Sequence, residues 1–214
     1  LKARLAYSTV SQLSYIVLGA MLASGIGAVG GAMHIAMHAF GKITLFFCAG
    51  AIMVASHKTE ISQMKGLGRK MPITFACFLI GALSIIGLPP LGGVWSKWYL
   101  SLGAAETGQL VFIAVFMISS LLNIAYLVPI VINGFFFAPP EEAHDDHHFD
   151  YHSHVDQGPG DATGPNQWRV RGFEEAPLMC VGALTFTAAG CIVLFFSANP
   201  LYEFLLPIAG GGTP

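Results

Sequence analysis

Residues 73–105 read ITFACFLIGALSIIGLPPLGGVWSKWYLSLGAA, and this stretch decides how the chain is arranged. It is apolar along most of its length, but Pro89 and Pro90, followed by Gly92 and Gly93, stand near its middle. Proline removes a backbone hydrogen-bond donor and clashes with the preceding helical turn, so a helix breaks here. The stretch therefore forms either two helices or one helix that is broken near its centre.

Helix length favours one broken helix. At about 1.5 Å per residue, residues 74–88 would form a helix of about 22 Å and residues 94–105 one of about 18 Å. The apolar core of a bilayer is about 30 Å thick, so neither half can cross it alone. We therefore expect the two halves to make a single crossing.

The composition is that of a membrane protein. Hydrophobic residues make up 54% of the 214 residues, charged residues only 10%, and the mean hydropathy is +0.65, whereas soluble domains carry about 25% charged residues. Four further apolar runs, at 5–26, 29–55, 110–136 and 177–197, reach the length of a spanning helix. The sequence predicts an all-α, polytopic transmembrane helix bundle with one broken helix.

The positions of the basic residues predict the orientation of the chain, because cytoplasmic loops are enriched in Lys and Arg. With five crossings, eight of the ten Lys and Arg residues fall on one side, in segments 1–4, 57–72 and 138–175. Six crossings would move Arg169 and Arg171 to the opposite side. We therefore expect a cytoplasmic N-terminus and a C-terminus outside.

This count divides the chain into four parts. Transmembrane helices occupy 1–137, a cytoplasmic loop 138–175, the last transmembrane helix 176–198 and a tail 199–214. The loop is acidic and contains five of the eight histidines, but it matches no fixed metal motif. We expect a solvated loop, with binding of divalent metal as the alternative.

Three ionisable residues, His34, His38 and Lys42, recur every four residues inside an apolar run. On a helix they form one stripe that rises about 6 Å per step. A lysine in the apolar part of a bilayer costs about 2.5 to 3.5 kcal/mol on insertion scales, so such residues usually face a bundle interior or a water-filled path. The stripe therefore needs an explanation.

Proton transfer is the interpretation that we favour for this stripe. A neutral histidine both donates and accepts hydrogen bonds, and histidine exists in both charge states at ordinary pH. Burial disfavours the charged form of a lysine, so a buried lysine can exchange its proton. Alternatively, His34 and His38 bond to neighbouring helices while Lys42 extends to the surface. We expect no metal site, because no carboxylate or cysteine accompanies the two histidines.

Lys97 follows the Pro-Pro-Leu-Gly-Gly break by a few residues. A broken helix inside a membrane exposes backbone groups that bind ions in transporters, although a structural kink would also explain the prolines. Polar residues of the first run recur at spacings of three and four, where they would either line a wet interior or hold helices together; they are Ser8, Ser11, Gln12 and Tyr15.

Four blocks, in this order, resemble a known family: LKARLAYSTVSQLSYIVLG (1–19), HIAMHAFGKITLFFCAGAI (34–52), MKGLGRKMP (64–72) and GLPPLGGVWSKWYL (87–100). They are similar to the C-terminal half of the antiporter-like subunits of respiratory complex I and of Mrp cation/proton antiporters, and most similar to the D-type subunits of the Mrp antiporters. WRVRGFEEAPLM (168–179) weakly supports this D type.

The resemblance implies half of an inverted-repeat module that translocates protons. It places His34, His38 and Lys42 in a central hydrophilic axis, and Lys97 at the broken-helix position where members carry Lys or Glu. The family's first half, with a buried glutamate, is not in this sequence, where Glu106 ends a helix and the other acids lie in loops or the tail. We expect a fragment or separated half, since Leu1 and its neighbours lack a signal peptide.

The predicted function is proton translocation in a multisubunit complex of a bacterial inner membrane. The expected partners are other membrane subunits, including a missing N-terminal half or homologous antiporter-like subunits, the lipid bilayer, protons and, as a further candidate, Na⁺. No cofactor and no nucleic acid are expected. If complex I-like, the chain would serve a proton-translocating NADH:quinone oxidoreductase without a redox centre of its own. The alternatives are a noncatalytic membrane scaffold and a stand-alone secondary transporter.

Overall fold

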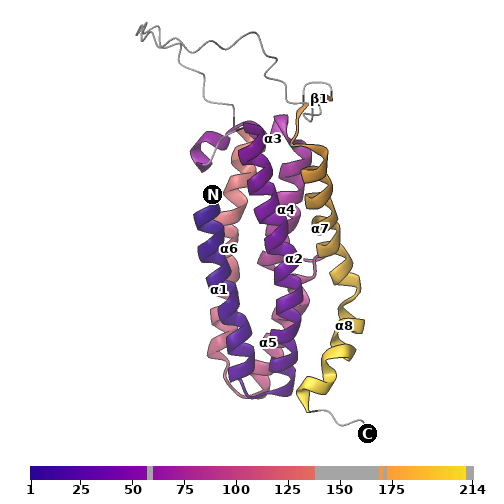
Figure 1. Cartoon of the computed structure of the whole chain (residues 1–214). Coiled ribbons are helices and arrows are strands. Elements are labelled where there is room, and N and C mark those ends of the chain that lie inside the picture. The colour runs from indigo at the N-terminus through magenta and orange to yellow at the C-terminus, as the bar shows by residue number, and fades with distance from the viewer. Residues whose placement is uncertain (57–59, 138–168, 171–172, 211–214) are drawn as a thin grey trace, which may run out of the picture.

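The computed structural model describes residues 1–56, 60–137, 169–170 and 173–210, which form an elongated helix bundle (Figure 1). Its helices are α1 (Lys2–Met21), α2 (Gly25–Ser56), α3 (Leu67–Lys70), α4 (Pro72–Ile86), α5 (Gly93–Glu106), α6 (Val111–Phe136), α7 (Leu178–Phe196) and α8 (Ala198–Leu205). Short 3-10 helices are η1 (Ile61–Met64) and η2 (Leu206–Ala209). The only described strands, β1 (Arg169–Val170) and β2 (Phe173–Glu174), form one antiparallel pair. The predicted all-α membrane bundle is confirmed.

The helix break lies where the sequence predicts it. Helix α4 starts with a proline in its first turn and ends at Gly87, whose φ of +87° is a left-handed conformation that glycine adopts easily. After residues 87–92 the chain resumes as α5, and α4 and α5 follow one another along the bundle (Figure 1). At Gly93 a Cβ atom would overlap the backbone carbonyl oxygen of Ser84, so the two halves approach each other only because this residue has no side chain.

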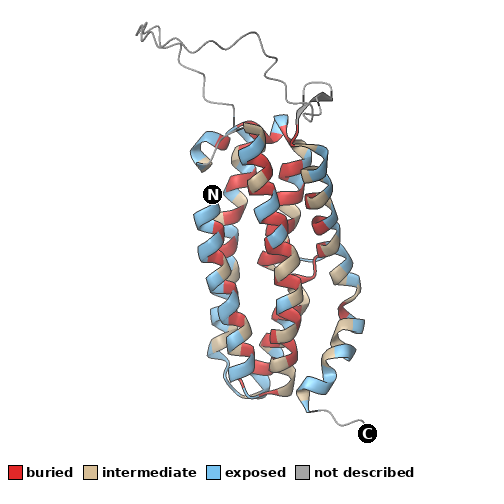
Figure 2. Cartoon of the chain, in the orientation of Figure 1, coloured by how far each residue is buried: buried red, intermediate tan, exposed pale blue. Residues whose placement is uncertain are grey.

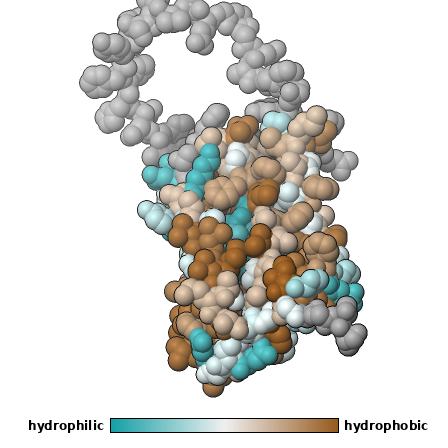
Figure 3. Space-filling view, turned by 60° about the horizontal axis from the view of Figure 1, so that its bottom comes forward, coloured by the Kyte–Doolittle hydropathy of each residue, from teal (hydrophilic) through white to brown (hydrophobic). Residues whose placement is uncertain are grey.

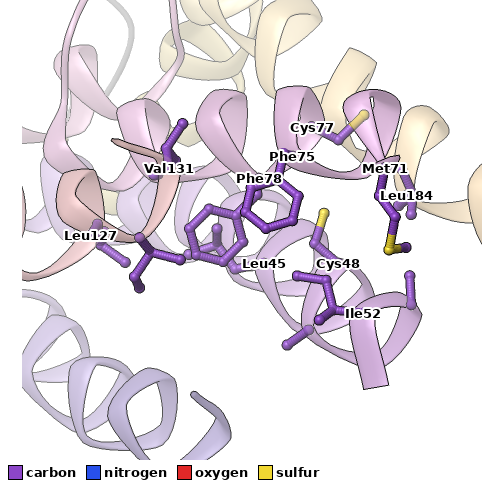
Figure 4. Packing of buried hydrophobic residues seen from close by; sticks show 14 of the residues in the cluster. Leu45, Cys48, Ile52, Met71, Phe75, Cys77, Phe78, Leu127, Val131 and Leu184 are labelled. Atoms are coloured by element: carbon purple, nitrogen blue, oxygen red, sulfur yellow. The ribbon is translucent and has the colours of Figure 1, made fainter. Parts of the chain in front are cut away.

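Helix α2 lies at the centre of the bundle and packs against α1, α4, α5 and α7. Buried residues line the inner faces of these helices, and exposed residues lie outside (Figure 2). In the largest apolar cluster, Phe75 and Phe78 of α4 pack with Leu45 and Ile52 of α2 and with Leu127 of α6 (Figure 4). This packing fixes the broken helix against the central helix.

The outer surface is apolar as well. Helices α2, α6 and α7 are each long and apolar enough to span a bilayer, whereas α4 and α5 have only 15 and 14 residues. Large apolar side chains such as Met117, Leu121 and Phe186 are exposed, and Figure 3 shows apolar residues over much of one face. An apolar exterior of this extent fits lipid rather than water.

Residues 199–209, which we placed in the tail, are helical. Helix α8 and η2 continue from α7 toward the end of the bundle opposite α3 (Figure 1). The ring of Tyr202 stacks on that of Tyr99 with 4.7 Å between centroids, and Leu201 packs against the cluster around Met33. These apolar contacts explain why the helix continues beyond residue 198.

Glu175 contradicts the prediction that the whole of segment 138–175 is solvated. Its side chain is only 8% exposed, and its carboxylate accepts hydrogen bonds from the Ile73 backbone N–H at 2.8 Å and from Thr74 Oγ1 at 2.7 Å. A helix N-terminus has unpaired N–H groups and a positive dipole end that favour a carboxylate. Glu175 therefore caps the N-terminus of α4. Residues 138–168, including the histidines of the loop, lie outside the described residues.

The close approach at Gly93 generates the first prediction. We expect Gly93→Ala to lower the stability of the membrane complex that contains this chain by about 1–3 kcal/mol, a typical cost of overpacking. Gly182→Ala is the matched control, because a Cβ atom there meets nothing within 4 Å. Thermal unfolding of the purified complex in detergent measures both. Equal stability of the two variants would contradict a close approach of α5 to Ser84.

The orientation of the bundle gives a second prediction. Gln63 in η1, just before α3, and Gln109 between α5 and α6 are exposed. In Figure 1, α3 lies at one end of the bundle and the connection from α5 to α6 at the other. In a background without the four native cysteines, a membrane-impermeant maleimide should label Gln63→Cys only from the cytoplasmic side and Gln109→Cys only from outside. Labelling of both variants from one side would rule out this topology.

Candidate functional site

The three ionisable residues of α2 all lie inside the bundle. His34, His38 and Lys42 are 3%, 8% and 5% exposed. They face α1 and α5, the two neighbours that supply hydrogen-bond partners for this stripe. The structure therefore places all three residues of the predicted stripe inside the bundle, in order along α2.

His34 joins three helices. Its Nδ1 lies 2.9 Å from Ser96 Oγ of α5, and its Nε2 lies 3.1 Å from Gln12 Oε1 on α1. The Gln12 oxygen accepts, so a neutral His34 donates its Nε2–H to it and accepts at Nδ1 from the Ser96 hydroxyl. Ser96 Oγ also lies 3.1 Å from the Gly93 carbonyl, to which the same hydroxyl donates when it does not bond to His34.

His38 differs from His34 in having no partner. Both of its ring nitrogens are buried without a hydrogen bond to any described residue. Its ring stacks on that of His34 with 5.7 Å between centroids. Buried polar groups are nearly always paired with protein or with ordered water. The environment of His38 is therefore one that suits water.

Lys42 is held inside the bundle and does not extend to the surface. Its Nζ donates to the Leu5 carbonyl of α1 at 3.2 Å. The polar face of α1 runs antiparallel to the stripe of α2, so that Leu5 meets Lys42 and Gln12 meets His34. The two helices thus enclose a polar strip within an apolar bundle.

Lys97 binds the broken end of α4. Its Nζ donates to the carbonyls of Ile85 and Ile86 at 3.0 and 2.9 Å and to Ser120 Oγ of α6 at 2.9 Å. The last carbonyls of a helix lack partners within the helix and carry a partial negative charge. The ammonium group also lies 5.5 Å from the centre of the Tyr15 ring. The break therefore creates the acceptors that hold this lysine.

Unpaired buried polar atoms gather in the same interior. Among the described residues, those without a partner belong to Gln12, Tyr15, His38, Asn123 and Trp95. Four of these five residues lie on α1, α2 or α6. A bundle interior that holds several such groups is suited to ordered water, which makes about three hydrogen bonds per molecule.

A cavity of about 460 Å³ opens beside Lys97, between α5 and α6. Its polar lining consists of Lys97, Ser101 and Ser120, and its rim carries the exposed side chains of Trp98 and Met117. Lys97 can therefore be reached from this cavity as well as from the polar strip between α1 and α2.

Sequence reasoning missed three polar partners, namely Ser96, Ser120 and Asn123. Ser96 and Ser120 look like ordinary small residues of membrane helices. Only their spacing from Lys97 and from the Pro-Pro break could have drawn attention to them. No three His, Cys, Asp or Glu side chains within the described ranges come together in a way that could hold a metal ion.

Comparison with known proteins identifies the family. The model of the family described as NADH:quinone oxidoreductase/Mrp antiporter, TM, matches residues 1–123. NADH-quinone oxidoreductase subunit N of Desulforudis audaxviator is 42% identical over 137 residues, which are 64% of this chain and 27% of the relative. NADH-quinone oxidoreductase subunit L of Rickettsia bellii is 42% identical over 114 residues, 53% of this chain and 17% of the relative. The chain thus spans about a quarter or less of these relatives.

Solved structures agree with this relationship. The bundle matches a chain of the Mrp complex from a Dietzia species with a TM-score of 0.76 at 25% identity, over 96% of this chain and 41% of that chain. It matches a chain of an archaeal membrane-bound sulfane sulfur reductase with a TM-score of 0.69 at 25% identity, over 88% of this chain and 27% of that one. A chain of Thermus thermophilus complex I, at 21% identity and a TM-score of 0.66, shares the fold over 99% of this chain and 40% of its own.

The order of the four sequence blocks, the broken helix and these matches agree with one another. This chain is a multi-pass membrane protein that belongs to the NADH:quinone oxidoreductase/Mrp antiporter family.

Proposed function

We propose that this chain conducts protons as an antiporter-like subunit of a multisubunit complex, of the Mrp type or of the complex I type, in a bacterial inner membrane. One observation carries the proposal: two buried lysines, Lys42 and Lys97, lie in a polar interior that also holds the two stacked histidines. The fold of the Mrp and complex I chains that match this one supports it.

The contacts of Lys97 suit a group that gains and loses a proton. A lysine ammonium has three donors, and here they meet three acceptors. A neutral amine keeps two donors for the carbonyls of Ile85 and Ile86, and its lone pair can accept from the Ser120 hydroxyl. Both forms of the lysine are therefore fully paired, because a hydroxyl both donates and accepts. A carboxylate partner would instead hold the lysine in its charged form.

The histidines suit the transfer of protons along α2. His34 is paired on both ring nitrogens, so its orientation is fixed. His38, stacked on it, has two unpaired nitrogens through which water can connect it to Lys42, and to His34 when one of the present hydrogen bonds of His34 opens. The stripe spans about 12 Å between His34 and Lys42, which is too far for transfer without such an intermediate.

The same interior implies partners. No carboxylate bonds to Lys42 or Lys97 among the described residues, and the chain spans about a quarter of the length of its relatives. We infer that further membrane subunits, or a segment like the one that precedes this region in the relatives, supply the groups that charge and discharge the lysines. Na⁺ would be a second cargo of an Mrp-type complex. In a complex I-type assembly, the redox centres would lie in other subunits.

Lys97 provides the decisive experiment. In the complex isolated from its native membrane and reconstituted into vesicles, we expect Lys97→Met to abolish formation of a pH gradient, because it keeps the length of the side chain and deletes the proton site. Lys97→Arg should fail too, since arginine stays protonated. Lys97→Glu should retain partial transport, because it can still titrate.

Lys65→Met, a change of the same kind at an exposed lysine, is the control and should transport normally. If Lys97→Arg worked while Lys97→Met did not, Lys97 would be a fixed charge and not a proton carrier. Full transport by both Lys97→Met and Lys42→Met would identify the chain as a scaffold.

His38 gives a separate prediction. His38→Ala should leave the complex assembled but slow proton flux by about tenfold, less than the roughly hundredfold or more that a positioned acid–base group contributes, because water in the gap can still carry protons. The gap that it leaves, about 12 Å, must then be crossed by water alone. Proton flux equal to that of the unmodified complex would argue against transfer along α2.

A further inference from the structure

We propose that Lys97 and Lys42 are joined by a second proton route, which runs through polar side chains of α6 and α1 and bypasses the histidines. This α6 route consists of Ser120, Asn123 and Tyr126 of α6 and Ser8 of α1. It deepens the proposed function and rests on it, because it assigns residues to the conduction of the same protons.

The route begins at the broken helix. Lys97 Nζ donates to Ser120 Oγ at 2.9 Å. Ser120, Asn123 and Tyr126 recur every three residues along α6, which places them as successive neighbours that rise about 4.5 Å per step. Asn123 is 2% exposed, so the face that they share is directed into the bundle at this level.

The middle of the route is a directed chain of hydrogen bonds. The Tyr126 hydroxyl donates to Asn123 Oδ1. Since its only proton is used there, the contact between Ser8 Oγ and the Tyr126 hydroxyl must have Ser8 as the donor. The chain therefore runs from Ser8 through Tyr126 to Asn123 and links α1 to α6.

The route ends beside the second lysine. Ser8 is 5% exposed and lies three residues from Leu5, whose carbonyl accepts the Lys42 ammonium at 3.2 Å. Residues three apart on a helix are neighbours on its surface. No hydrogen bond joins Ser8 to Lys42 in the described parts of the chain, so a water between them would complete the route from α6 through α1 to the second lysine.

The gap between Ser120 and Tyr126 coincides with an unpaired buried group. Asn123 Nδ2 has no partner among the described residues, and it lies between Ser120 and the Tyr126 hydroxyl along α6. An ordered water that accepts from Nδ2 and contacts Ser120 Oγ would pair it and close the gap. Asn123 would hold this water without carrying a proton itself.

Each step conserves protons. In the direction in which Ser8 donates to Tyr126, the Lys42 ammonium releases one proton through water to Ser8, and Ser8 passes its own proton to the Tyr126 hydroxyl. Tyr126 turns its proton from Asn123 Oδ1 to the bridging water, the water passes one to Ser120 Oγ, and Ser120 passes its own proton to the neutral Lys97 amine. Every oxygen gains one proton and loses one, so that only the directions of the hydrogen bonds change and rotation of the hydroxyls restores them.

Two parallel routes and two steps of one route differ in how their variants combine. We would measure proton flux in vesicles that contain the complete complex with Tyr126→Phe, with His38→Ala and with both changes. Tyr126→Phe keeps the ring and removes only the hydroxyl. Tyr202→Phe is the matched control, because that tyrosine of α8 stacks on Tyr99 of α5 and forms no hydrogen bond to either lysine within the described chain.

If the α6 route exists, Tyr126→Phe alone slows flux by less than about twofold, and adding it to His38→Ala slows flux by about a hundredfold, well beyond the product of the single effects. Asn123→Leu should behave as Tyr126→Phe does. Tyr202→Phe should add nothing to His38→Ala.

Two results would overturn the α6 route. If the double variant were no slower than the product of its singles, Tyr126 would not carry a bypass. If Tyr126→Phe or Asn123→Leu dissociated the complex in size-exclusion chromatography, the contact would serve to hold α1 to α6. Failure of the proposed function has a different signature, in which Lys97→Met itself leaves the flux unchanged.

Discussion

The arrangement of this protein depends on the three hydrogen bonds between Lys97 and its acceptors at the helix break. Each hydrogen bond to a charged group contributes about 1.5–3 kcal/mol, whereas a lysine at the centre of a membrane helix costs about 2.5–3.5 kcal/mol. Three such bonds outweigh this cost without a carboxylate. The acceptors exist because the Pro-Pro-Leu-Gly-Gly sequence leaves the carbonyls at the end of α4 unpaired. A continuous helix here would offer no such acceptors.

The break also determines which helices can surround the polar interior. Because Gly93 lets α5 start against Ser84 of α4, Ser96 comes close enough to bond to His34 on α2. Glu175 holds the other end of α4 through Ile73 and Thr74. The broken helix is thus fixed at its start and at its middle, and one polar group of the histidine stripe is fixed with it.

The sequence predicted the features that depend on local rules and missed those that depend on contacts between distant residues. The break and the spacing of His34 to Lys42 follow from proline chemistry and helical periodicity, and the family follows from the resemblance of four sequence blocks. Glu175 could not be found in this way, because its partner Ile73 is 102 residues away along the chain. Helix α8 was missed because Pro200 marks a helix end in isolation, whereas here it lies within the first turn of a helix that packs on Tyr99.

Polar residues inside membrane bundles are hard to assign for a related reason. Ser120 and Asn123 could be read as groups that hold helices together, and in the bundle Asn123 does accept from Tyr126. What separates a conducting role from a structural one is whether a group remains unpaired. His38 on α2 and Asn123 on α6 keep buried donors or acceptors free, while His34 and Ser8 beside them are paired. Under the proposed function, these free groups alternating with fixed ones are the positions at which water would carry protons between Lys42 and Lys97.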